Sequence, residues 1–150
     1  MSNLKETLLK QCEAFINKRL QNVQQNIAEV EFALTSETKN TAGDKHETGR
    51  AMLQLEREKY GQQLSEINQL KLAFSKINIT KISEVVCLGS LVYTSQANYF
   101  IAISAGELQT TNFKAYAIAP NTPIGKLLIG KKQGETVIFR GEEITLLQVV

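Results

Sequence analysis

The spacing of apolar residues divides the chain into two halves with different periods. In the first half, apolar residues alternate spacings of four and three, which is the seven-residue repeat of a coiled-coil seam. Leu9 extends this stripe towards the N-terminus. The pattern predicts a long helix over about residues 3–35 with a single apolar stripe that needs a partner. The stripe consists of Ile16, Leu20, Val23, Ile27, Val30 and Leu34.

A second apolar stripe follows after residue 50, and it is interrupted by Arg57 and Lys71. The two stripes can bury each other if the two helices fold back antiparallel. Gly61 lies inside the second pattern, where glycine disfavours a helix by about 1 kcal/mol relative to alanine. We therefore predict an antiparallel coiled-coil hairpin over residues 1–78, with its tip near residues 36–48. The second stripe consists of Leu53, Tyr60, Leu64, Ile67 and Phe74.

From about residue 79 the pattern changes to short β-branched and aromatic runs, which are typical of strands. Pro123 and Gly130 bracket one short helix over residues 122–129, with Thr122 placed as its N-cap. A linker near residues 76–80 separates this region from the hairpin. The sequence thus predicts an α+β protein, with a small α+β domain over residues 79–150. The predicted strands cover residues 91–93, 99–103, 113–118, 136–139 and 144–149.

Composition limits the classes of function. The 150 residues are 43% hydrophobic and 21% charged, with a net charge of +2. This balance argues against binding nucleic acid by charge alone. Cys12 and Cys87 lack the spacing of a metal knuckle, so we expect reduced core thiols in a cytoplasmic protein. We expect no signal region at the N-terminus and no membrane-spanning segment, because no apolar run approaches about 18 residues.

Two acids stand at the predicted tip, in the segment Gly43-Asp44-Lys45-His46-Glu47. Asp44 and Glu47 have the spacing of a capping box, which is one interpretation of the pair. The other is metal binding shared with a partner. Mg²⁺ often takes only one or two carboxylates, its other ligands being water and phosphate, so a second protein could supply the rest. A lone histidine such as His46 adds little to such a site.

These residues resemble the Gre family of bacterial transcript-cleavage factors. The tip of that family reads Gly-Asp-Leu-x-Glu, and the Gly-Asp-x-x-Glu core is present here at residues 43–47. A second, longer resemblance covers residues 122–135, Thr-Pro followed by an apolar helix and Leu-Ile-Gly-Lys-Lys-Gln-Gly-Glu. The two matches occur in the order of the family, so the resemblance covers nearly the whole chain.

The resemblance implies a fold and a function. It implies that the C-terminal domain is FKBP-like and that the coiled coil enters the secondary channel of RNA polymerase. Asp44 and Glu47 would help to bind a Mg²⁺ ion shared with the polymerase active site, next to the RNA 3′ end. Asn121, Thr122 and Pro123 would contact the polymerase. The protein itself would be no enzyme, would bind no cofactor alone and would act as a monomer.

The tip also departs from the family. Thr48, Arg50 and Ala51 replace the asparagine, glutamate and tyrosine that follow the core, and Lys45 and His46 make the tip more basic. A cation close to carboxylates competes with a metal ion for them. Three alternatives therefore stay open. They are a Gre-like channel inhibitor without cleavage stimulation, an FKBP-like prolyl isomerase or chaperone, and a structural coiled-coil adaptor whose tip acids only cap a helix.

Overall fold

The computed structural model describes the backbone of residues 2–39 and 44–150, and the side chains of residues 4–36 and 48–150. The predicted tip therefore falls largely outside the described residues. The chain divides into two compact units. One unit is Ile16–Leu72. The other combines Met1–Phe15 with Ala73–Val150. The first turns of the first helix thus group with the C-terminal region, whereas the sequence-based division placed all of residues 1–78 in the hairpin.

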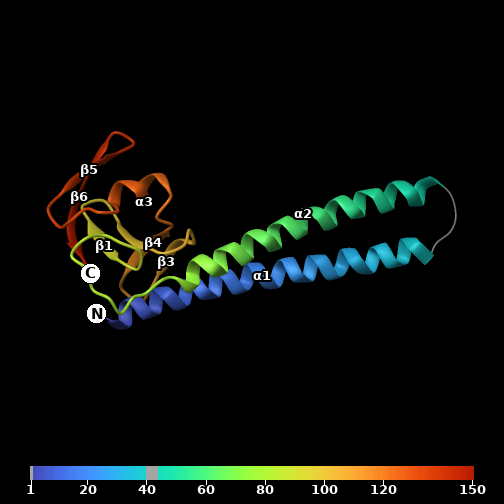
Figure 1. Cartoon of the computed structure of the whole chain (residues 1–150), viewed down its shortest axis with the longest axis horizontal. Helices are drawn as coiled ribbons and strands as arrows, with labels where there is room; N and C mark the ends of the chain where they lie inside the picture. Colours follow the sequence, from blue (N-terminus) through green and yellow to red (C-terminus); the bar gives the residue numbers. More distant parts are fainter. Residues whose placement is uncertain (1, 40–43) are drawn as a thin grey trace. The chain divides into compact units, whose positions relative to one another are not determined.

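The first unit is a helical hairpin. Helix α1 spans Ser2–Lys39 and helix α2 spans Asp44–Ser75, and the two lie side by side and run antiparallel (Figure 1). Ile16, Val23 and Val30 are buried at intervals of seven residues on α1, and Ile67 is buried on α2. The predicted hairpin is confirmed, and its seam is the heptad stripe.

The first turns of α1 pack within the second unit through a different set of residues. Leu8 and Cys12 are fully buried, whereas Leu9, which the heptad pattern selected, is only partly buried. Lys5 lies on the same buried stripe. Gln11 Nε2 donates to the carbonyl oxygen of Gln109 at 2.8 Å, which joins the helix to a strand. Tertiary packing in the second unit decides which face of α1 is buried here.

The second unit contains a six-stranded mixed sheet with the order β3-β4-β2-β1-β6-β5. Strands β2 and β4 pair in parallel, and the other neighbours pair antiparallel. Together with the hairpin, this sheet confirms the predicted α+β fold. The likeness to the FKBP fold stays a prediction. The strands are β1 (Leu91–Thr94), β2 (Asn98–Ile101), β3 (Gly106–Gln109), β4 (Lys114–Ile118), β5 (Thr136–Phe139) and β6 (Glu142–Val149).

Five of these strands correspond to predicted runs, but β3 does not. Strand β3 lies at one edge of the sheet, pairs with β4 alone, and buries only Leu108. A strand with a single buried apolar residue shows no alternation of apolar and polar positions, so the sequence pattern did not predict it. Conversely, the β-branched residues between Ile79 and Val86 form no strand, and Val85 makes only an isolated bridge to Lys132.

Helix α3 (Pro123–Leu128) completes the core of the second unit. Ile124 and Leu128 pack with Val92, Ile101 and other buried strand residues in one hydrophobic cluster. Helix α3 lies against the sheet in Figure 1. Gly130 follows the helix with φ of 84°, a left-handed conformation that favours glycine and ends the helix as predicted. This arrangement fixes the entry to α3, residues 121–123, which are the three predicted partner-binding residues.

Candidate functional site

The two tip acids lie in the first turn of α2. The helix begins at Asp44, and Glu47 follows three residues later. Backbone N–H groups at a helix start favour nearby negative charge. The side chains of Asp44, Lys45, His46 and Glu47 lie outside the described side chains. The capping and metal-assisting roles of the pair therefore both stay predictions, and the structure fixes only the position of the two residues on the helix.

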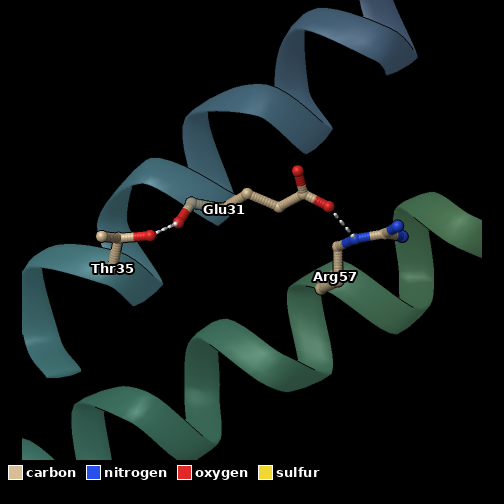
Figure 2. Close-up of polar contacts among 3 residues, drawn as sticks. All are labelled: Glu31, Thr35 and Arg57. Atoms are coloured by element: carbon tan, nitrogen blue, oxygen red, sulfur yellow. Dashed lines mark hydrogen bonds and ion pairs between the residues drawn. The ribbon is translucent and has the colours of Figure 1, made fainter.

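Polar contacts of Arg50 and Arg57 join α1 to α2 in the half of the hairpin that leads to the tip. Arg50 Nη1 donates to the carbonyl oxygen of Leu34 at 3.4 Å. Arg57 Nε donates to Glu31 Oε1 at 3.1 Å (Figure 2). The hydroxyl of Thr35 donates to the carbonyl oxygen of Glu31 at 2.9 Å. Arg57, which interrupts the apolar stripe in the sequence, is thus a cross-hairpin ion-pair partner.

Arg50 has a structural role that sequence reasoning missed. The sequence marked it only as a basic residue in the place of a family acid. In the structure its partly buried side chain reaches across to α1, six residues after the start of α2. No local pattern indicated this contact, because Leu34 is sixteen positions away along the chain. The arginine therefore helps to hold the ends of the two helices together next to the acids.

The predicted docking residues form the entry to α3. The Thr122 side chain accepts a hydrogen bond from the N–H of Gly125 at 3.1 Å, and its hydroxyl donates to the carbonyl oxygen of Ala119 at 2.7 Å. Pro123 occupies the first helical position. The predicted N-cap is confirmed. Asn121 and Pro123 are exposed on either side of this cap, so both are available to a partner, while Thr122 positions them.

Gly125 allows residues 119–122 to pack tightly against the start of α3. A Cβ atom at this position would lie 2.8 Å from Thr122 Oγ1 and 3.0 Å from the carbonyl oxygen of Pro120, and closer still to that of Ala119. Backbone oxygens cannot move aside as a flexible side chain can. The Thr122 hydroxyl and the carbonyl oxygens of Ala119 and Pro120 therefore occupy space that a side chain at residue 125 would need, and only glycine fits there.

The prolyl isomerase alternative predicts an aromatic-lined pocket in the second unit. A pocket of about 480 Å³ is lined by Glu84, Lys132, Gln133, Gly134 and Val149, none of which is aromatic. Several aromatic side chains pack in pairs instead. The ring centroids of Tyr93 and Phe113 lie 5.6 Å apart, and those of Tyr99 and Tyr116 lie 6.2 Å apart.

The described side chains do not form a metal site by themselves. Among them, no group of three or more His, Cys, Asp or Glu residues could hold an ion, and the tip carboxylates are not part of that set. Within the same described ranges, no helix has a stretch long and apolar enough to cross a membrane. Asp44 and Glu47 belong to one compact unit, and the predicted docking residues Asn121, Thr122 and Pro123 belong to the other.

Comparison with known proteins does not assign the chain to a family. No model of a known protein family matches it, and no curated protein matches it.

Proposed function

We propose that this protein is a cytoplasmic RNA polymerase-binding elongation factor. In this proposal the helical hairpin enters the secondary channel of the polymerase, and the protein assists cleavage of backtracked RNA without being an enzyme itself. The observation that carries the proposal is the position of Asp44 and Glu47 together in the first turn of α2, the second of the two antiparallel helices of the hairpin.

The chemistry of this position suits a shared metal ion. Two carboxylates on one helical turn can supply one or two oxygen ligands, which is a typical protein contribution to a Mg²⁺ site in which phosphate and water supply the rest. In a two-metal phosphodiester reaction such an ion stabilises the attacking or the leaving oxygen. The polymerase would supply the remaining ligands and the catalytic groups.

The entry to α3 supports a second point of attachment. Asn121 and Pro123 are exposed, and the capped, glycine-packed turn holds them in a defined conformation. A preorganised surface loses less conformational freedom on binding. We propose that these two residues contact the polymerase and that Thr122 supports them.

A Gre-like channel regulator without cleavage stimulation is the second candidate, and Arg50 favours it. Arg50 lies three positions after Glu47, a spacing that makes side chains neighbours on a helix surface, and it is held by the Leu34 carbonyl. A fixed cation beside the acids would weaken their binding of a metal ion.

One experiment separates the two functions. The purified protein is added to stalled, backtracked elongation complexes with Mg²⁺, and the length of the RNA is measured. Shortened RNA supports the cleavage function. If the RNA stays intact but the protein competes with a factor that does stimulate cleavage, the protein is a channel regulator. If the RNA is not shortened and the protein does not compete with such a factor, both proposals are excluded.

A further inference from the structure

The two edges of the sheet differ in how well they are protected. Strand β3 forms one edge, and the carbonyl oxygen of its residue Gln109 accepts a hydrogen bond from Gln11 Nε2 at 2.8 Å. The same strand carries the charged residue Glu107, which forms an ion pair with Lys114. Occupied backbone groups and charged side chains discourage an edge strand from pairing with another chain. Strand β5 forms the opposite edge with the sequence Thr-Val-Ile-Phe, which contains no charged residue and no proline.

The backbone of β5 points alternately towards β6 and away from it. The N–H of Leu146 in β6 donates to the carbonyl oxygen of Glu135 at 2.9 Å, so Glu135 faces β6. Residues of an antiparallel strand alternate between those that exchange hydrogen bonds with a given neighbour and those that do not. Val137 therefore also faces β6, whereas the N–H and C=O groups of Thr136 and Ile138 point away from it, towards the edge of the sheet.

The outward-facing residues of β5 have no partner strand. Within the part of the chain that the structure describes, β5 pairs with β6 alone, and neither Thr136 nor Ile138 makes a backbone hydrogen bond to any other segment. Both residues are exposed, and the exposed fraction of Ile138 is 65%. An apolar edge with unpaired backbone groups is a template for another strand.

We propose that β5 pairs antiparallel with β5 of a second copy of this chain, so that the two sheets join across a two-fold axis. In this arrangement Val137 lies opposite Val137 of the other copy, and Thr136 lies opposite Ile138. The outward-facing N–H and C=O groups of Thr136 and Ile138 then bond to one another across the axis. The same surface of each copy forms the interface, as two-fold symmetry requires.

The residues that flank β5 suit a second copy as the occupant of this edge. In the same register Glu135 lies opposite Phe139 of the other copy, one position from its Arg140. Opposite charges therefore come close at both ends of the paired strands, and no like charges lie directly opposite each other. A strand of four residues buries less than the about 1,600 Å² of a standard interface, so we expect a weak dimer. This pairing is independent of the function proposed above.

The association is measured by sedimentation velocity of the full chain from low micromolar to millimolar concentration, together with amide hydrogen exchange followed by NMR. We expect a reversible dimer at the upper end of this range. Exchange at the Thr136 and Ile138 amides should slow severalfold as the dimer forms. The Val137 amide, which already faces β6, should not change.

Two variants test whether β5 is the interface. Ile138→Lys and Thr136→Pro should each abolish the dimer, because lysine and proline protect an edge strand from pairing. Proline at residue 136 removes an N–H group that the folded monomer does not use. The control Ile82→Lys changes another exposed isoleucine of the same compact unit and should leave the association unchanged. Thermal unfolding of each variant confirms that it is folded.

Two results would overturn the proposal. A chain that stays monomeric throughout the concentration range would do so, and the edge would then be left to an extended segment of another protein. Dimers that persist in folded Ile138→Lys and folded Thr136→Pro would also do so, because the copies would then meet elsewhere. If Thr136→Pro does not fold, Ile138→Lys and the exchange rates of the β5 amides still decide between these outcomes.

Discussion

Arg57 Nη1 lies 3.3 Å from the point at which a Cβ atom of residue 61 would stand, so Gly61 leaves room for the arginine. Residues four apart are neighbours on a helix surface, and Arg57 uses this room while its Nε bonds to Glu31 on α1 (Figure 2). A glycine inside α2 has no explanation in the local sequence. The structure supplies one, because the glycine accompanies a cross-hairpin ion pair.

Gly61→Ala should therefore stabilise the protein less than helix propensity alone predicts. The propensity gain is about 1 kcal/mol. Displacing Arg57 from an exposed ion pair removes between about 0 and 1 kcal/mol. Urea unfolding of Gly61→Ala should show a smaller gain in the wild-type background than in an Arg57→Ala background. Equal gains in both backgrounds would show that Arg57 does not restrict residue 61.

Gly125→Ala should destabilise the protein by about 1 to 3 kcal/mol, as expected when an atom is forced into a packed site. The added methyl group would meet the carbonyl oxygens of Ala119 and Pro120 and the hydroxyl of Thr122. Chemical unfolding measures the loss. Gly130→Ala is an informative comparison, because a Cβ there meets no atom within 4 Å and only its positive φ is unfavourable. A larger loss at residue 130 than at 125 would contradict the packing argument.

At the tip, Asp44→Asn and Glu47→Gln should abolish stimulation of RNA cleavage and change thermal stability little. Asparagine caps a helix about as well as aspartate, and glutamine is accepted in place of glutamate at the N3 position of a capping box. The variants thus remove charge and keep hydrogen bonding, and only a Mg²⁺ site needs the charged oxygens. The measurement is RNA length in backtracked elongation complexes.

If Asp44→Asn and Glu47→Gln both stimulate cleavage as well as the wild type does, the metal-assisting role is refuted. If the wild type itself is inactive, Arg50→Glu is the next variant to test, because it introduces the glutamate that the Gre family, which the tip resembles, carries at this position. It also removes the bond to the Leu34 carbonyl, so a thermal melt must accompany the assay.

The double change Asn121→Ala with Pro123→Ala should weaken binding to RNA polymerase severalfold in a pull-down, because both side chains are exposed at the entry to α3. Thr122→Ser is the matched control. It keeps the hydroxyl that accepts from Gly125 and donates to Ala119, and it should bind normally. Unchanged binding by a folded double variant would mean that this segment serves only as a helix cap.

The stability of the protein should depend on the ionisation of Cys12 at alkaline pH. Burial raises the pKa of the folded thiol from 9.0 to about 11. Between these values the unfolded chain loses the proton and the folded chain keeps it, so rising pH favours unfolding. The free energy of unfolding of the wild type should therefore fall towards that of Cys12→Ala from about pH 9 to 11. Other titrating groups, Lys5 included, contribute equally to both proteins, so their contribution cancels in the difference between the two free energies of unfolding. A constant difference across that range would contradict the prediction.

Local patterns were sufficient for much of the fold. The heptad spacing of Ile16, Val23 and Val30 predicted the hairpin, since a repeat of seven needs only a partner helix of the same kind. The helix signals at Thr122, Pro123 and Gly130 likewise depend on neighbours within a few residues, and the structure confirms them. The positions of Asp44 and Glu47 at the start of α2 also followed from local sequence.

Contacts between distant segments were decided by the tertiary structure alone. Strand β3 exists because β4 supplies its hydrogen bonds, although only Leu108 is buried in it. The burial of Leu8 instead of Leu9 and the burial of Lys5 arise where α1 packs within the sheet unit. Sequence periodicity determines which face of an element is apolar. Which residue that face meets depends on chain segments up to a hundred positions away, and only folding brings those together.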